Sequence, residues 1–205
     1  MTVMEKSGFV HVVEPGEADR APLLLLHGTG GDERDLLPLG RALAPGAALI
    51  SPRGKVLEGA MPRFFRRLAE GVFDEDDLRL RTDELAAFVE EIRAEHRLAA
   101  PIALGFSNGA NIAASLLMTN PGVLAGAILV RAMPPYAEPP AADLGATQVL
   151  LLNGAFDPIV PEAAADRLAS DLERAGAKLT RHMLPAGHAL SQADLAIARD
   201  WLSKR

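Results

Sequence analysis

The chain has 205 residues, 49% of them hydrophobic, and this length suits one compact α/β domain over residues 1–205. Its formal charge of −6 argues against a nucleic-acid partner, because such binding needs a basic face. The absence of cysteine excludes disulfides, thiolate-bound zinc and a cysteine nucleophile. Apolar runs such as Leu23 to Leu26 are far too short to span a bilayer, and the N-terminus shows no signal-peptide pattern, so we expect a cytoplasmic protein.

Short apolar runs alternate along the chain with longer helical patterns. The runs read as strands buried on both faces of a parallel sheet: Phe9–Val13, Pro22–Leu26, Ala47–Ile50, Ile102–Phe106, Gly126–Val130, Gln148–Leu152 and Leu179–Leu184. The helical patterns are a stripe from Leu85 to Ile92, a run from Asn111 to Met118, a helix from Pro161 to about Gly176, and one from a capping box at Ser191 to about Leu202. This alternation predicts a mostly parallel sheet with helices on both faces. The Pro-rich stretch Met133–Pro140 is predicted to be a surface loop.

The pentapeptide Gly105-Phe-Ser-Asn-Gly109 joins a predicted strand to a predicted helix. A serine on so tight a turn adopts a strained backbone conformation, and its hydroxyl stands clear of the sheet. Glycines fit two residues before and after it, because the chain approaches itself closely there. The bare pattern is weak, but its strand-then-helix context makes Ser107 the candidate nucleophile. The alternative is a Gly-rich turn with an incidental serine.

A nucleophilic serine needs a base and a carboxylate that orients the base, and in sheets of this kind they follow in the order Ser, Asp or Glu, His. Asp157 follows the predicted strand Gln148–Leu152 in a turn-rich loop, where its alternative role is to accept local backbone N–H groups. His188 lies on the loop between the last strand and the last helix. The competing carboxylates and histidines fit less well by position: Asp143, Asp166, Asp171, His11, His96 and His182.

Two backbone donors are needed for the oxyanion of acyl transfer. One is the N–H of Asn108, which follows the serine, and the second should come from the loop after an early strand. Leu23–Leu26 runs into His-Gly-Thr-Gly-Gly, so we assign the N–H of Thr29, with Gly28 and Gly30 shaping the loop. We expect His27 to hold this loop by hydrogen bonding and to transfer no proton. A nucleotide site is disfavoured, because the glycines fail G-x-G-x-x-G and no Gly-Lys-Ser/Thr follows.

Four segments, LLLLHGTGGDERDLLPLG, GFSNGANIAASLL, NGAFDPIVP and LPAGH, together resemble the α/β-hydrolase superfamily. Within it they resemble the phospholipase/carboxylesterase family of small, largely lidless serine esterases, in order and spacing over nearly the whole chain. The resemblance implies an α/β-hydrolase fold with no large lid domain, hydrolysis of carboxylic esters or thioesters, and no cofactor or metal. It places the triad on Ser107, Asp157 and His188 and the oxyanion donors on Thr29 and Asn108. It allows a homodimer, although the sequence shows no interface.

The chain departs from the acyl-protein thioesterases at two places. They usually have Gly-Phe-Ser-Gln-Gly-Gly at the nucleophile, where this chain has Asn108-Gly109-Ala110, and they tend to have His-Gly before the acid, where it has Asn153-Gly154. Together with the Ser51–Leu78 segment, these differences look closer to small bacterial carboxylesterases.

The Ser51–Leu78 segment leaves its strand at the sheet edge of the catalytic loops. Five side chains are candidates for the wall of an acyl or aromatic pocket: Phe64, Phe65 and Phe73, with Met133 and Ile159 opposite. The alternative is that they pack the segment onto the domain.

The expected function is hydrolysis of small soluble or short-acyl carboxylic esters through a Ser-His-Asp triad and an acyl-enzyme intermediate. The reaction requires a neutral imidazole, so it should speed up as the pH rises through about 6 to 7. Lysophospholipase, acyl thioesterase or peptidase activity stays open, as does a binding protein that has lost catalysis.

Overall fold

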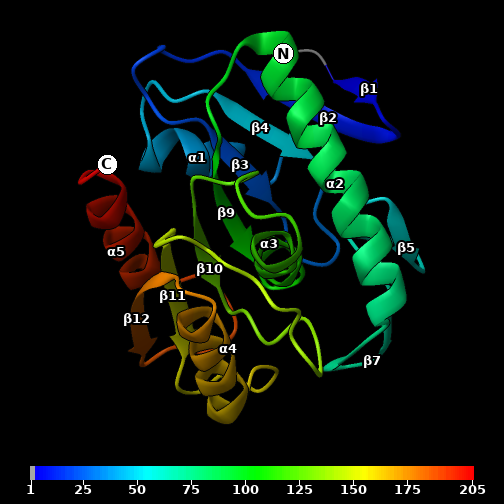
Figure 1. Ribbon diagram of the computed structural model, residues 1–205, viewed down its shortest axis with the longest axis vertical. Coiled ribbons are helices and arrows are strands. Elements are labelled where there is room, and N and C mark those ends of the chain that lie inside the picture. The colour runs from blue at the N-terminus through cyan, green and yellow to red at the C-terminus, as the bar shows by residue number, and fades with distance from the viewer. Residues whose placement is uncertain (1–2) are drawn as a thin grey trace.

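The computed structural model describes residues 3–205, and its centre is a twisted sheet (Figure 1). Eight strands form that sheet within these residues, in the spatial order β1 (Met4–Lys6), β2 (Phe9–Glu14), β4 (Leu49–Pro52), β3 (Leu23–Leu26), β9 (Ile102–Phe106), β10 (Gly126–Val130), β11 (Gln148–Gly154) and β12 (Lys178–Leu184). The pairs β1–β2 and β2–β4 are antiparallel, and all pairs from β4 to β12 are parallel. The prediction of a mostly parallel sheet is confirmed.

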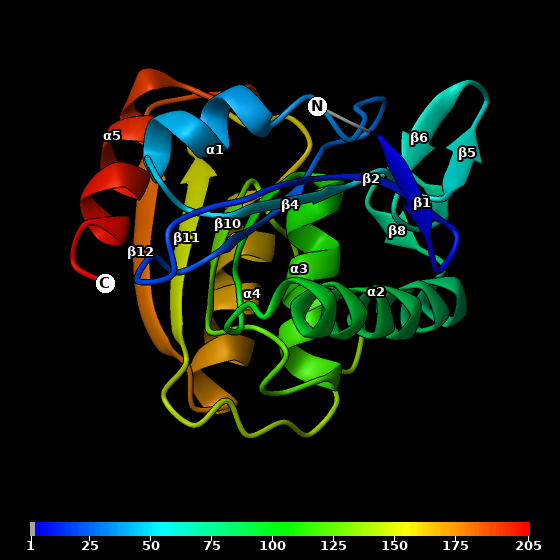
Figure 2. The same ribbon diagram turned by 90° about the horizontal axis from the view of Figure 1, so that it is seen from above.

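Helices cover both faces of the sheet, as the sequence predicts (Figure 2). One face packs against α2 (Glu75–His96), α3 (Asn108–Thr119) and α4 (Glu162–Arg174), and the other against α1 (Leu37–Leu43) and α5 (Gln192–Leu202). Alternate residues of one strand enter the two cores, so Leu24 and Leu26 lie on the α3 side and Leu23 and Leu25 on the α5 side. Strands buried on both faces therefore have continuous apolar runs.

Two small antiparallel hairpins precede α2, and the strand predictions do not include them. They are β5 (Val56–Glu58) with β6 (Met61–Arg63), and β7 (Arg67–Ala69) with β8 (Val72–Phe73). Strands of two or three residues are too short to show a period of two, so pattern analysis cannot find them. Helix α1 and strand β1 are also absent from the predicted elements. Both are short as well.

The predicted ends of α4, α5 and most strands agree closely with the structure. Helix α5 begins after the capping box at Ser191, whose side chain accepts the N–H of Asp194, and α4 begins after Pro161. Helix α2 is longer than its predicted stripe, because Asp74 caps it by accepting the N–H of Asp77. The stretch Met133–Pro140 contains no helix or strand. Within residues 3–205, no helix combines the length and apolarity that crossing a bilayer requires.

Candidate active site

Ser107 is the single residue between β9 and α3, at the carboxyl end of a central strand. Its backbone has φ 52° and ψ −114°, a region that costs a non-glycine residue about 1–3 kcal/mol. The flanking glycines permit this turn. A Cβ on Gly105 would lie 2.6 Å from the carbonyl oxygen of Gly109, and one on Gly109 would lie 2.0 Å from that of Leu26. The strained turn holds the serine above the sheet edge.

Three side chains from three loops meet at this edge. The Nε2 atom of His188 lies 2.9 Å from Oγ of Ser107, and its Nδ1 atom lies 2.8 Å from Oδ2 of Asp157. The loops follow β9, β11 and β12, which lie on one side of the sheet in the order β9, β10, β11, β12 (Figure 1). Parallel strands end at the same edge, and this is why residues 81 positions apart come into contact.

The hydrogen bonds define what each group can do. The side chain of Asp157 is fully buried. Its Oδ1 accepts the backbone N–H groups of Ile159 (2.8 Å) and Val160 (3.0 Å), and its Oδ2 faces the imidazole. A carboxylate can only accept, so Nδ1 of His188 carries a proton and Nε2 is left to accept the Ser107 hydroxyl proton. Asp157 therefore does two things at once. It accepts the backbone N–H groups of its own turn, and it contacts the imidazole of His188.

Arg131 holds the loop that carries His188 through hydrogen bonds to its backbone. The sequence patterns do not single out this residue. Its Nε donates to the carbonyl of Gly187 (2.8 Å) and its Nη2 to that of Ala189 (3.2 Å). Its two terminal nitrogens also donate to the two carboxylate oxygens of Asp194, at 2.8 Å each. In the sequence, Arg131 could have been noticed by its position, because it is a charged residue directly after the apolar strand β10.

Thr29 and Asn108, the predicted oxyanion donors, both line the cavity that contains Ser107 and His188. The backbone N–H of Thr29 has no acceptor within residues 3–205. Asn108 is the first residue of α3, so its N–H is one of the donors that a helix leaves unpaired. Gly28 lies beside the ring of Phe106, where a Cβ would come within 2.8 Å of it, and does not line the cavity.

His27 holds the Thr29 loop by hydrogen bonds, as the sequence predicts. Its Nδ1 lies 2.6 Å from the carbonyl oxygen of Gly28 and its Nε2 is 3.0 Å from the backbone nitrogen of Gly54. The carbonyl can only accept and the N–H can only donate, which fixes a neutral tautomer. Burial lowers the pKa of His27, and the Gly28 carbonyl and nearby carboxylates only partly offset it. This histidine does not line the cavity around Ser107, and its ring nitrogens are both engaged in holding the loop.

The cavity around Ser107 has a volume of about 320 Å³. Phe73, Met133 and Ile159 line it, together with residues that the sequence does not place in the site: Met61, Arg63, Arg67, Glu70, Gly71, Asn111, Arg131 and Val160. Phe64 and Phe65 do not line it. Both are buried, Phe64 with its ring centroid 4.7 Å from that of His27 and Phe65 edge-on to Phe73. These two rings pack the Ser51–Leu78 segment onto the core.

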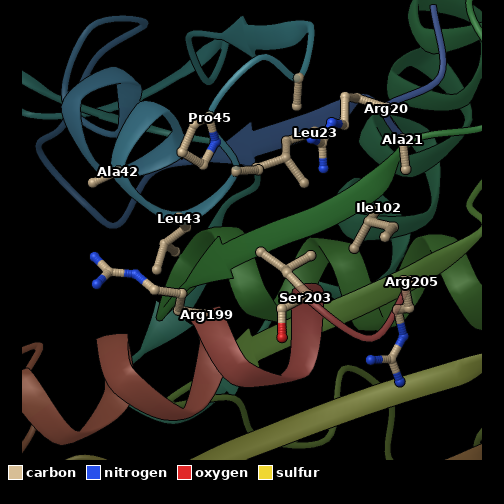
Figure 3. Close-up of a pocket in the computed structure, with 13 residues that line it drawn as sticks. Arg20, Ala21, Leu23, Ala42, Leu43, Pro45, Ile102, Arg199, Ser203 and Arg205 are labelled. Atoms are coloured by element: carbon tan, nitrogen blue, oxygen red, sulfur yellow. The ribbon is translucent and has the colours of Figure 1, made fainter. Parts of the chain in front are cut away.

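A larger cavity of about 490 Å³ lies at the opposite ends of the strands, beside the starts of β3 and β9 (Figure 3). Its walls are mainly apolar, with Arg20, Arg199 and Arg205 around them, and no histidine, aspartate or glutamate lines it. It therefore lacks a base or an acid for catalysis. No cluster of three or more histidines and carboxylates suited to a metal ion occurs within residues 3–205.

Comparisons with known proteins show which family and which solved structures the chain resembles. A family model described as Phospholipase/Carboxylesterase matches residues 8–205. MhqD of Bacillus subtilis (strain 168) is 46% identical over 193 residues, which cover 93% of this chain and 96% of that protein. A carboxylesterase structure from Bacillus cereus is 44% identical, with a TM-score of 0.93 over 96% of this chain and 94% of that one. A carboxylesterase structure from Mesorhizobium loti is 34% identical, with a TM-score of 0.94 over 100% and 99%.

Proposed function

The chain belongs to the phospholipase/carboxylesterase family and is a carboxylesterase, and from that premise we propose that it cleaves small soluble or short-acyl esters through a triad of Ser107, His188 and Asp157. The observation that carries the proposal is the pair of hydrogen bonds that links the three side chains, 2.9 Å from serine to histidine and 2.8 Å from histidine to aspartate. A hydroxyl, an imidazole and a buried carboxylate in this order can activate the serine for attack on a carbonyl.

The first half of the reaction forms an acyl-enzyme. The Ser107 oxygen attacks the ester carbonyl while Nε2 of His188 takes its proton, and Asp157 keeps the imidazole in the tautomer that can accept. The N–H groups of Thr29 and Asn108 are the proposed donors to the oxygen that gains negative charge, and removing one such donor costs roughly 3 kcal/mol of barrier. The tetrahedral intermediate then expels the alcohol, which receives the proton from His188.

The second half releases the acid. A water molecule gives its proton to Nε2 of His188 and attacks the acyl carbon, and Ser107 leaves with that proton. The His188 side chain is 20% exposed, so water can reach it without a large movement. The apolar part of the cavity (Met61, Phe73, Met133 and Ile159) and its volume of about 320 Å³ suit a short acyl or small aromatic group.

Labelling with a fluorophosphonate tests the nucleophile. We expect the probe to modify the wild-type protein and the control Ser203→Ala, whose serine lines the other cavity, but not Ser107→Ala. Labelling that persists in Ser107→Ala would refute the assignment. A wild-type protein that neither labels nor hydrolyses esters would favour a binding protein that has lost catalysis.

A panel of p-nitrophenyl esters from acetate to palmitate tests the substrate class. We expect kcat/KM to be highest for short chains. An optimum at palmitate would instead favour a lysophospholipase, and faster cleavage of matched acyl thioesters than of the oxygen esters would favour a thioesterase.

A further inference from the structure

The Gly54–Phe64 segment contacts both parts of the chain that carry a proposed oxyanion donor. It includes the β5–β6 hairpin and lies far from those parts in sequence. Four hydrogen bonds connect them: Gly54 N–H to His27 Nε2 (3.0 Å), Gly30 N–H to the Pro62 carbonyl (2.9 Å), Arg63 Nη1 to Thr29 Oγ1 (2.6 Å), and Phe64 N–H to Asn108 Oδ1 (2.7 Å). The segment therefore supports the two stretches of chain, around Thr29 and at Asn108, that border Ser107.

Arg63 is the charged member of this set, and it is only 3% exposed. Its Nε donates to the carbonyl of Phe65 (3.2 Å) and lies 3.4 Å from a carboxylate oxygen of Glu58. Burial lowers the pKa of Arg63, and the charge of Arg67 lowers it further. Burying a guanidinium is costly unless its donors are used, so the bond to Thr29 is part of what makes this buried position tolerable.

The Thr29 loop contains a residue whose backbone is conformationally permissive. Gly30, the next residue, has φ 85°, and glycine in that region restricts the backbone very little. The Thr29 hydroxyl accepts from Arg63, whereas its backbone N–H has no acceptor within residues 3–205. Two backbone hydrogen bonds flank this residue, Gly30 N–H to the Pro62 carbonyl and Gly31 N–H to the Gly28 carbonyl. The bond to the Thr29 side chain adds a third constraint on the direction of the Thr29 N–H.

We propose that Arg63 is a positioning residue of the oxyanion hole: it holds Thr29 so that the Thr29 N–H stays directed into the Ser107 cavity. This inference rests on the proposed function. The charge on the substrate oxygen develops only on the way to the tetrahedral intermediate, so a misplaced donor slows the chemical step more than it weakens substrate binding.

The test is a double-mutant cycle of Arg63→Met and Thr29→Val, with Arg81→Met as the matched control. Valine has the shape of threonine and keeps the backbone N–H but removes the acceptor oxygen. Arg81 is also a partly buried arginine that pairs with carboxylates, those of Asp77 and Glu84, but it does not line the Ser107 cavity and forms no hydrogen bond to Thr29 within residues 3–205. Turnover of a short p-nitrophenyl ester is divided by the concentration of active sites, measured by fluorophosphonate labelling taken to completion.

We expect R63M and T29V each to lower kcat by about 10- to 100-fold, with KM changed less than about threefold. The double variant should be no slower than the slower single one, because both changes break one interaction. R81M should stay within about threefold of wild type, and R63K should recover part of the loss.

Several results would overturn the inference: equal losses in R63M and R81M, independent losses that multiply in the double variant, or a raised KM at constant kcat. A lower melting temperature with normal turnover per active site would show a merely structural role. If R63M does not fold, an unchanged kcat in T29V overturns the inference and a reduced one supports it. A wild-type protein without Ser107-dependent hydrolysis would contradict the proposed function instead, before any Arg63 variant is compared.

Discussion

Arg131 and Asp194 form a buried ion pair behind the His188 loop, with side chains 0% and 1% exposed. Both carboxylate oxygens accept from the guanidinium, and Oδ2 also accepts the backbone N–H (2.8 Å) and hydroxyl (2.7 Å) of Ser191. Asp194→Asn keeps the size of this side chain but removes its charge. Its amide nitrogen must then face donors of Arg131 or Ser191 in either orientation, and the buried guanidinium loses its counter-charge.

The expected cost follows from this geometry. Removing one partner of a buried, hydrogen-bonded pair destabilises a protein by about 3–5 kcal/mol, because the other charge stays buried. For a chain of this size each kcal/mol lowers the melting temperature by about 2–4 °C, so D194N should melt roughly 6–20 °C below wild type.

Thermal unfolding at pH 7, followed by circular dichroism, measures the effect, with Asp171→Asn as the matched control. Asp171 is also a buried aspartate, but its partner at 3.0 Å, Arg174, has a side chain that is 67% exposed and can return to water. We therefore expect D171N to lose less than about 1 kcal/mol. Losses of similar size in the two variants would refute the argument that burial of the partner sets the cost.

The same pair predicts a pH dependence. Burial opposes ionisation of Asp194, but the hydrogen bonds from Arg131 and Ser191 outweigh it and lower the pKa of this carboxyl below its ordinary value of 3.8. A carboxyl with a lowered pKa contributes stability that is present above its unfolded value and is lost as the pH falls through the folded one. Wild-type stability should therefore drop below about pH 4 more steeply than that of D194N.

Other consequences concern catalysis, packing and pH. Asp157→Asn should lower kcat by about 10³- to 10⁴-fold with little change in melting temperature, because the imidazole loses the acceptor that sets its tautomer; near-normal turnover would exclude this role. Gly109→Ala should prevent folding, as its Cβ would lie 2.0 Å from the Leu26 carbonyl oxygen, and a soluble variant with a wild-type melting temperature would contradict the close approach. Burial lowers the pKa of His27, so the free energy of unfolding in urea should fall as the pH drops below about 6.5, and His27→Gln should lack this part of the slope. That variant should also be less stable at pH 7, since Gly54 loses its acceptor.

The sheet and the three triad candidates could be predicted for one physical reason. Parallel strands buried on both faces have long apolar runs, and such strands all end at one edge, so residues that directly follow them must lie near each other. Ser107, Asp157 and His188 all follow strands in this way. Strands β9, β11 and β12 lie in the same half of the sheet, with β10 between β9 and β11, so the loops that follow them bring the three side chains to one place.

Position after a strand does not tell what a residue does there, and Arg131 shows the limit. It follows β10 just as Ser107 follows β9, and its φ of 57° is also positive. Its side chain, however, donates to the carbonyls of Gly187 and Ala189, on either side of His188. The role of Arg63 is harder still to predict from the sequence, because its partner Thr29 lies 34 residues earlier and a three-residue strand brings the two together. Local patterns identify groups that can react, whereas the groups that hold them in place are defined by long-range contacts with no periodic signal.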